Sequence, residues 1–275
     1  MPPRKKKAAP QPDLLDASAT TAPAVPLIRE AVASWRNGGY ARISDTTRLL
    51  LRWWFPPDGH RLRGGAGRRF RYHPFQREAI ETLIYLYEVE EIRSQKTLLE
   101  TFVRRSDLQL LQYDDFARYC LKMATGSGKT KVISLAIAWQ YLNSVAEGRD
   151  DFARTFLVLA PNVIVYERLR ADFGGGSIFR VDPVIPPELR LYWDLEVYLR
   201  GEGERASSSG ALYLTNVQQL HTRDQEDDEP DPMTLVLGPK PPTKTEETVG
   251  FLDRVVARGG ACLVVNDEAH HTHDE

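Results

Sequence analysis

The chain has 275 residues, of which 42% are hydrophobic and 27% are charged, and its formal net charge is −2. These values are ordinary for a globular protein of one or two domains, whereas the near-neutral charge excludes a uniformly basic surface. No apolar run approaches the roughly 20 residues that span a bilayer, and the amino terminus lacks the apolar segment of a signal peptide. We therefore expect a cytoplasmic protein with no membrane partner.

The first part of the chain divides into a tail and an accessory region. Residues 1–26 hold a basic cluster followed by Pro, Ala and Thr, which predicts a disordered tail. Residues 27–72 predict a small helical and hairpin region. Its segment RWWFPPDGHRLRGGAGRRFRYH combines arginines with aromatic side chains, which fits contact with nucleic acid or with the ring of ATP. The alternative, which we prefer, is a β-hairpin that buries the aromatic rings and leaves the arginines in solvent.

Residues 73–275 are expected to form the main domain. They open with an amphipathic helix, because apolar residues recur at three- and four-residue spacing from Ile80 to Tyr87 and Pro74 stands near the start. Four short apolar runs follow, separated by helical stretches, and they predict an α/β fold with a parallel sheet and helices on both faces. The runs are RYCLKMA (118–124), TFLVLAP (155–161), ALYLTN (211–216) and ACLVVNDEAH (261–270).

Two further features accompany these runs. Cys120 and Cys262 each lie in one of them, which predicts that both side chains are buried. Residues 223–247 are acidic and then proline-rich, so we expect a mobile insertion in the domain.

The segment ATGSGKT has the composition of a phosphate-binding loop. Gly126 and Gly128 permit a tight turn that points amide groups at phosphate oxygens, and the helix that follows adds the positive end of its dipole. Lys129 can reach the β- and γ-phosphates, and the Thr130 hydroxyl can ligate magnesium. Met123 stands where the general motif has glycine. The segment predicts binding of a nucleoside triphosphate.

The last apolar run ends in two adjacent carboxylates, Asp267 and Glu268. A strand would deliver both to the sheet edge where parallel α/β folds bind ligands. Phosphoryl-transfer chemistry needs one acid to hold magnesium and another to orient or deprotonate the attacking water. The pair therefore predicts the second half of the nucleotide site.

MATGSGKT and NDEAH, in that order, resemble motifs I and II of superfamily 2 helicases and translocases, in which the loop usually starts with alanine. LVLAPNVIVYERLRADF resembles motif Ia, and LYLTNVQQL resembles the following DNA-contact motif. The combination is most similar to the restriction subunit of type III restriction enzymes over residues 71–273. The resemblance implies a RecA-like P-loop NTPase domain that uses ATP and magnesium.

The resemblance also implies residue roles. Magnesium would be held by Thr130 and Asp267, with Glu268 as the base and His270 coupling hydrolysis to movement. The other implied contacts are to nucleotide, by Gln76 (to adenine), Thr125, Gly126, Ser127, Gly128, Lys129 and Thr130, and to the DNA backbone, by Pro161, Asn162, Thr215 and Asn216.

Simpler alternatives exist for several of these residues. Asn162 is also a common helix cap, and Gln76 fits an exposed residue in the first turn of its helix. His270, His271 and His273 with Asp274 fit a metal cluster, although other ligands for zinc are lacking at that spacing.

The resemblance implies the ATP-binding half of a translocase on double-stranded DNA, in a restriction enzyme with a DNA methyltransferase (modification) partner. A second RecA-like domain would supply a transition-state arginine. Since no such domain follows Glu275, we expect an amino-terminal fragment with weak activity by itself. The alternative is a nucleotide-binding module that hydrolyses little ATP and acts through a partner protein.

Overall fold

The computed structural model describes five stretches of the chain, residues 24–61, 69–103, 116–199, 208–216 and 253–267. The chain divides into two compact units, of which one holds Met1–Ile43 and Glu78–Lys122 and the other Ser44–Arg77 and Met123–Glu275. The predicted accessory region is therefore split, since residues 44–72 cluster with the sheet. The predicted tail up to residue 23 and the predicted insertion lie outside the described residues.

The first unit is helical. The amphipathic helix predicted after residue 73 is confirmed, and the boundary between the units falls within it. Ile80 and Ile84 on this helix are completely buried. Beside them the buried Glu81 accepts a hydrogen bond from Arg36 Nε at 2.7 Å, so its charge is compensated. The helices concerned are α2 (Ala24–Asn37), α4 (Pro74–Ile84), the π-helix η1 (Tyr85–Val89) and α5 (Gln95–Phe102). Because α2 starts at Ala24, it begins inside the segment predicted as tail.

The second unit contains a parallel sheet in the strand order β4-β5-β3-β6. Its two central strands are nearly all apolar and buried on both faces, as the sequence predicts. In the outer strand β6 every second residue is exposed. The strands are β3 (Thr155–Ala160), β4 (Leu195–Leu199), β5 (Gly210–Asn216) and β6 (Cys262–Asn266).

Strand prediction was wrong at two places. Residues 118–124 pair with no strand in the described part of the chain, although exposed and half-buried residues alternate along them. β4 was not expected, and it pairs in register with β5 from Leu195 opposite Gly210. Local apolar patterning identifies extended segments, but a ladder also requires a neighbouring strand.

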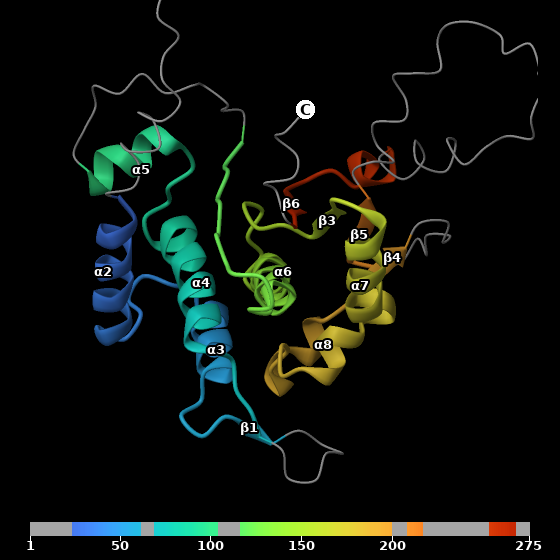
Figure 1. The fold of residues 1–275 in the computed structure, drawn as a ribbon, viewed down its shortest axis with the longest axis horizontal. Coiled ribbons are helices and arrows are strands. Elements are labelled where there is room, and N and C mark those ends of the chain that lie inside the picture. Colours follow the sequence, from blue (N-terminus) through green and yellow to red (C-terminus); the bar gives the residue numbers. More distant parts are fainter. Residues whose placement is uncertain (1–23, 62–68, 104–115, 200–207, 217–252, 268–275) are drawn as a thin grey trace, which may run out of the picture. The chain divides into compact units, whose positions relative to one another are not determined.

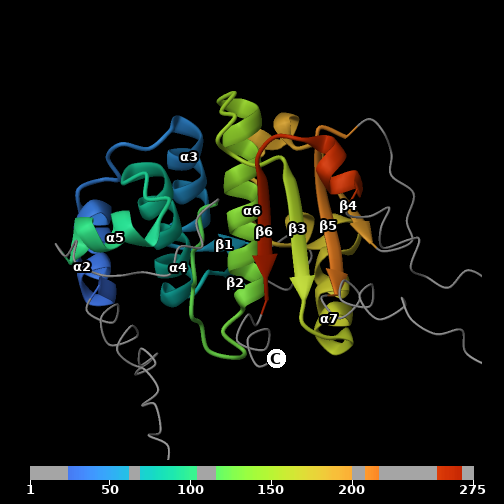
Figure 2. The ribbon, with the colours of Figure 1, turned by 90° about the horizontal axis from the view of Figure 1, so that it is seen from above.

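Helices cover both faces of the sheet, which confirms the predicted α/β architecture. Figures 1 and 2 show α6 (Lys129–Ala146) and α7 (Val163–Phe173) on one face and the helical residues 253–258 on the other. Val255 packs there against a cluster that includes Leu157 and Tyr213. The remaining short helices of this unit are η2 (Gly174–Gly176), α8 (Ser177–Val181) and η3 (Pro187–Tyr192).

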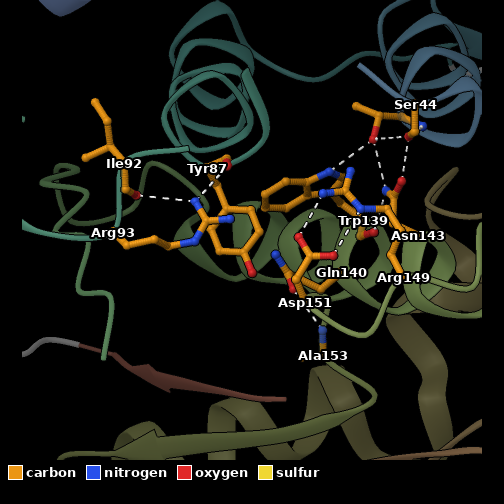
Figure 3. Close-up of polar contacts among 11 residues, drawn as sticks. Ser44, Tyr87, Ile92, Arg93, Trp139, Gln140, Asn143, Arg149, Asp151 and Ala153 are labelled. Carbon is orange, nitrogen blue, oxygen red and sulfur yellow. Dashed lines mark hydrogen bonds and ion pairs between the residues drawn. The ribbon is translucent and has the colours of Figure 1, made fainter. Parts of the chain in front are cut away.

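Helix α6 is buried almost all round because α3 (Asp45–Trp54) packs on it. The contact is polar (Figure 3): Asn143 Nδ2 and Trp139 Nε1 both donate to Thr47 Oγ1, at 2.9 and 3.1 Å. Ser44 Oγ, the N-cap of α3, donates to Asn143 Oδ1 at 2.5 Å. These bonds satisfy groups that would be costly to bury unpaired, and they join α3 to the helix that follows the glycine loop.

The basic aromatic segment forms a hairpin, as preferred from the sequence. Its strands β1 (His60–Arg61) and β2 (Arg69–Phe70) pair antiparallel. Trp54, just before it, is buried, and its Nε1 donates to Val184 O at 2.8 Å.

The cysteine prediction was wrong, because Cys120 and Cys262 are both exposed. Neither lies in a strand that is covered on both faces. None of the helices in the described stretches is long and apolar enough to cross a membrane.

Candidate nucleotide-binding site

The glycine loop ends at the start of α6. Gly126 and Gly128 have φ of 76° and 78°, in the left-handed region that favours glycine. Gly128 is the N-cap of α6, and Lys131 N donates to Gly128 O at 2.9 Å as the helix begins. Since a glycine cap has no side chain, it does not itself bond to the first-turn amides, and the helix start presents the positive end of its dipole.

Gln76, in the first turn of α4, braces this loop. Its Nε2 donates to Ser127 O at 2.8 Å, and its Oε1 accepts from His73 N at 2.9 Å. The side chain is buried, which excludes the simple alternative of an exposed surface residue. A Cβ on Gly128 would lie 2.5 Å from Gln76 Nε2, so the close approach of the amide requires glycine here.

The opposite side of the loop is open. Thr125 and Gly126 are exposed, and a Cβ on Gly126 would meet no atom within 4 Å. Ser127 Oγ is buried and, in the described part of the chain, has no hydrogen-bond partner. Such a buried hydroxyl at the start of a helix fits the oxygens of a phosphate.

The beginning of α6 is anchored by an ion pair. Lys129 and Thr130 lie in its first turn, half-buried. Lys131 pairs with Asp182, the buried C-cap residue of α8. Burial, with a smaller contribution from the negative charge of Asp182, raises the pKa of the Tyr72 hydroxyl well above its usual value. The Lys131–Asp182 ion pair holds the end of α6 that carries Lys129.

Asp267 follows β6 directly. Its backbone N donates to Leu159 O at 3.1 Å, which extends the β3–β6 ladder by one step. Its side chain is only 2% exposed and accepts from Arg168 Nη2 at 3.1 Å. Figure 2 shows that the strands end at the edge of the sheet where α6 begins. The carboxylate and the glycine loop therefore lie at one edge of the sheet.

The donor set suits magnesium. The Thr130 hydroxyl and the Asp267 carboxylate would supply oxygen ligands, which this cation prefers, and magnesium usually keeps several waters besides. The Asp267 carboxylate already pairs with the guanidinium of Arg168, which shows that a positive charge is favourable beside it.

Of the residues predicted to contact DNA, one is engaged in a helix cap and the others are buried. Asn162 Oδ1 accepts from Val165 N at 2.9 Å, so the capping alternative is confirmed for this side chain. Pro161 is buried, and Thr215 and Asn216 are each 2% exposed. Their contact with DNA stays a prediction.

Several predicted residues lie outside the described residues, namely Glu268, His270, His271, His273 and Asp274. In contrast, three contact residues were missed from the sequence. Arg168 meets Asp267 across 99 residues, and Lys131 meets Asp182 across 51. No local pattern marks such pairs, because helix packing on the sheet brings them together.

The fold and this site define a P-loop α/β domain of the RecA-like class. The family model described as "Type III restriction enzyme, res subunit" matches residues 69–275. The chain belongs to this family, whose model represents a helicase-like ATPase domain. Neither the curated proteins nor the solved structures that were searched gave a match.

Proposed function

We propose that this chain binds ATP with magnesium and is the ATP-binding half of a DNA translocase in a type III-like restriction enzyme. The observation that carries the proposal is the open glycine loop at the sheet edge that also bears Asp267, with a Ser127 hydroxyl that has no partner among the described residues. Family membership supports an ATP-binding, helicase-like role.

Each part of the site has a role in this proposal. The loop from Thr125 to Gly128 and the Lys129 ammonium hold the phosphates. Thr130 and Asp267 would hold magnesium, which would supply positive charge against the phosphates. Glu268 orients and deprotonates the attacking water, and His270 couples turnover to movement.

The partners follow from the family. We propose double-stranded DNA as the track and a modification subunit as the partner protein, with the cytoplasm as the location. Full turnover would require a second RecA-like domain that contributes an arginine, an effect worth about 10³–10⁵ in rate where it is known.

The test is ATP hydrolysis with and without double-stranded DNA, measured beside Glu268→Gln and combined with binding of a fluorescent ATP analogue. We expect binding in both proteins and DNA-stimulated hydrolysis that is lost in the variant. Equal hydrolysis by both would exclude Glu268 as the base. Binding without turnover in either protein, DNA present or not, would favour the nucleotide-binding module that acts through a partner.

A further inference from the structure

The carboxylate of Asp267 already has a cation. Arg168 Nη2 donates to Asp267 Oδ2 at 3.1 Å, whereas the backbone N–H of Asp267 is used by Leu159 O. The Asp267 side chain is 2% exposed, and a carboxylate at that depth is stable only with a compensating partner. Arg168 is that partner in the structure.

The two members of the pair differ in freedom. Asp267 is fixed by its strand, but the Arg168 side chain on α7 is 51% exposed. The backbone of α7 is itself held, since Asn162 caps it and Leu169 is completely buried. Arg168 can therefore leave Asp267 by turning its side chain into water, with no movement of the helix.

A metal at Asp267 and the guanidinium of Arg168 compete. Both are cations that need the same carboxylate, and like charges a few ångströms apart repel more strongly where water is scarce. Magnesium bound by Asp267 therefore gains stability if Arg168 leaves.

We propose that Arg168 is a resident counter-ion that magnesium displaces from Asp267 when the nucleotide binds, an inference that rests on the proposed function. Before the nucleotide arrives, Arg168 keeps the carboxylate compensated. When MgATP or MgADP binds, Arg168 turns into solvent, so part of the magnesium-binding energy is spent on breaking the pair. If Arg168 instead held Asp267 in place for the metal, removing Arg168 would lower the affinity for magnesium rather than raise it.

The experiment measures the dissociation constant of a fluorescent ADP analogue in excess Mg²⁺ and in EDTA, and takes the ratio of the EDTA value to the Mg²⁺ value. In Arg168→Gln this ratio should rise about fivefold, as expected for a half-exposed ion pair of roughly 1 kcal/mol. The affinity in EDTA should stay as in the wild type. Arg170→Gln is the matched control, because Arg170 lies on the same helix and pairs only with Glu167 in the contacts described; its ratio should not change.

A ratio that is unchanged or lower in Arg168→Gln overturns the inference. Failure of the wild type to bind the analogue in either buffer overturns the proposed function instead, so the two failures are distinguishable. A second measurement does not depend on the folding of the glutamine variant. The NMR signal of the Arg168 Nε–H, assigned with Arg168→Lys, should move on addition of ADP with Mg²⁺ and stay in place on addition of ADP with EDTA. An identical response in both buffers would also overturn the inference.

Discussion

The two halves of the nucleotide site differ in how ready they are for a ligand. The phosphate half is open: Gly126 faces empty space and Ser127 Oγ has no partner within the described structure. The half proposed to bind magnesium is closed, because Asp267 is buried and paired with Arg168. Within the described residues, the first half therefore has a hydroxyl that is available to a ligand, whereas the carboxylate of the second half already has a positively charged partner.

This difference follows from charge. Amides and hydroxyls that lack a partner cost a moderate amount and can be left to water or to a ligand, whereas an ionised carboxylate buried without a partner costs much more. A preformed phosphate loop can therefore stay empty, but a preformed metal carboxylate needs a cation.

The largest effect is expected at the phosphate half. Lys129→Ala removes an ammonium–phosphate contact worth roughly 1.5–3 kcal/mol, so affinity for ATP should fall about 10- to 150-fold. The measurement is titration with a fluorescent ATP analogue. Lys96→Ala is the control, since Lys96 is an exposed lysine on α5. Unchanged affinity in Lys129→Ala would contradict the assignment of this segment as a phosphate-binding loop.

Two glycine substitutions distinguish the cost of the left-handed backbone conformation from the contribution of Gln76, which braces the loop. Gly126→Ala should cost only the left-handed conformation, roughly 1–2 kcal/mol, because the added methyl meets no atom. Gly128→Ala should cost more, since its methyl would also displace Gln76 Nε2. Thermal unfolding and nucleotide titration measure both. Equal losses in the two variants would show that the brace adds nothing.

Gln76→Leu tests the brace itself. Loss of its bond to Ser127 O should weaken ATP binding by about five- to tenfold, the equivalent of roughly 1 kcal/mol or slightly more. As a brace, Gln76 affects ATP and GTP equally, whereas as the reader of adenine it affects ATP alone. The matched control is Gln140→Leu, another buried glutamine, which accepts a bond from Ala153 N. It should lower stability and leave nucleotide affinity unchanged.

The smallest effect is expected at the cap of the helix that carries Arg168. Asn162→Ala should reduce stability by roughly 1 kcal/mol through loss of the cap, and Asn162→Asp should retain it. Chemical denaturation measures both. Binding to double-stranded DNA is measured with Asn162→Ser, which can also cap the helix but adds no charge: if this variant keeps stability and weakens DNA binding, the side chain also contacts the DNA backbone.

Local pattern predicted some elements well and others poorly. The helices beginning at Pro74 and Lys129 and the strands β3, β5 and β6 were found because each has a strong apolar period or run. Residues 118–124 have a similar run but no ladder, and the split of residues 27–72 between two units left no mark in composition. Pairing and unit boundaries depend on residues distant in the chain, which a local window does not contain.

The sequence by itself determined the loop, the acids after the last strand and the family, because glycine conformation and adjacent carboxylates are local properties. Only the tertiary structure decided that Gln76 holds the loop through Ser127, that Asn162 caps α7 and that Arg168 forms an ion pair with Asp267. These side chains have several chemically acceptable partners. The Asn162 cap is a local contact, whereas the partners of Gln76 and Arg168 are set by packing, which brings Arg168 beside Asp267 from 99 positions away in the chain.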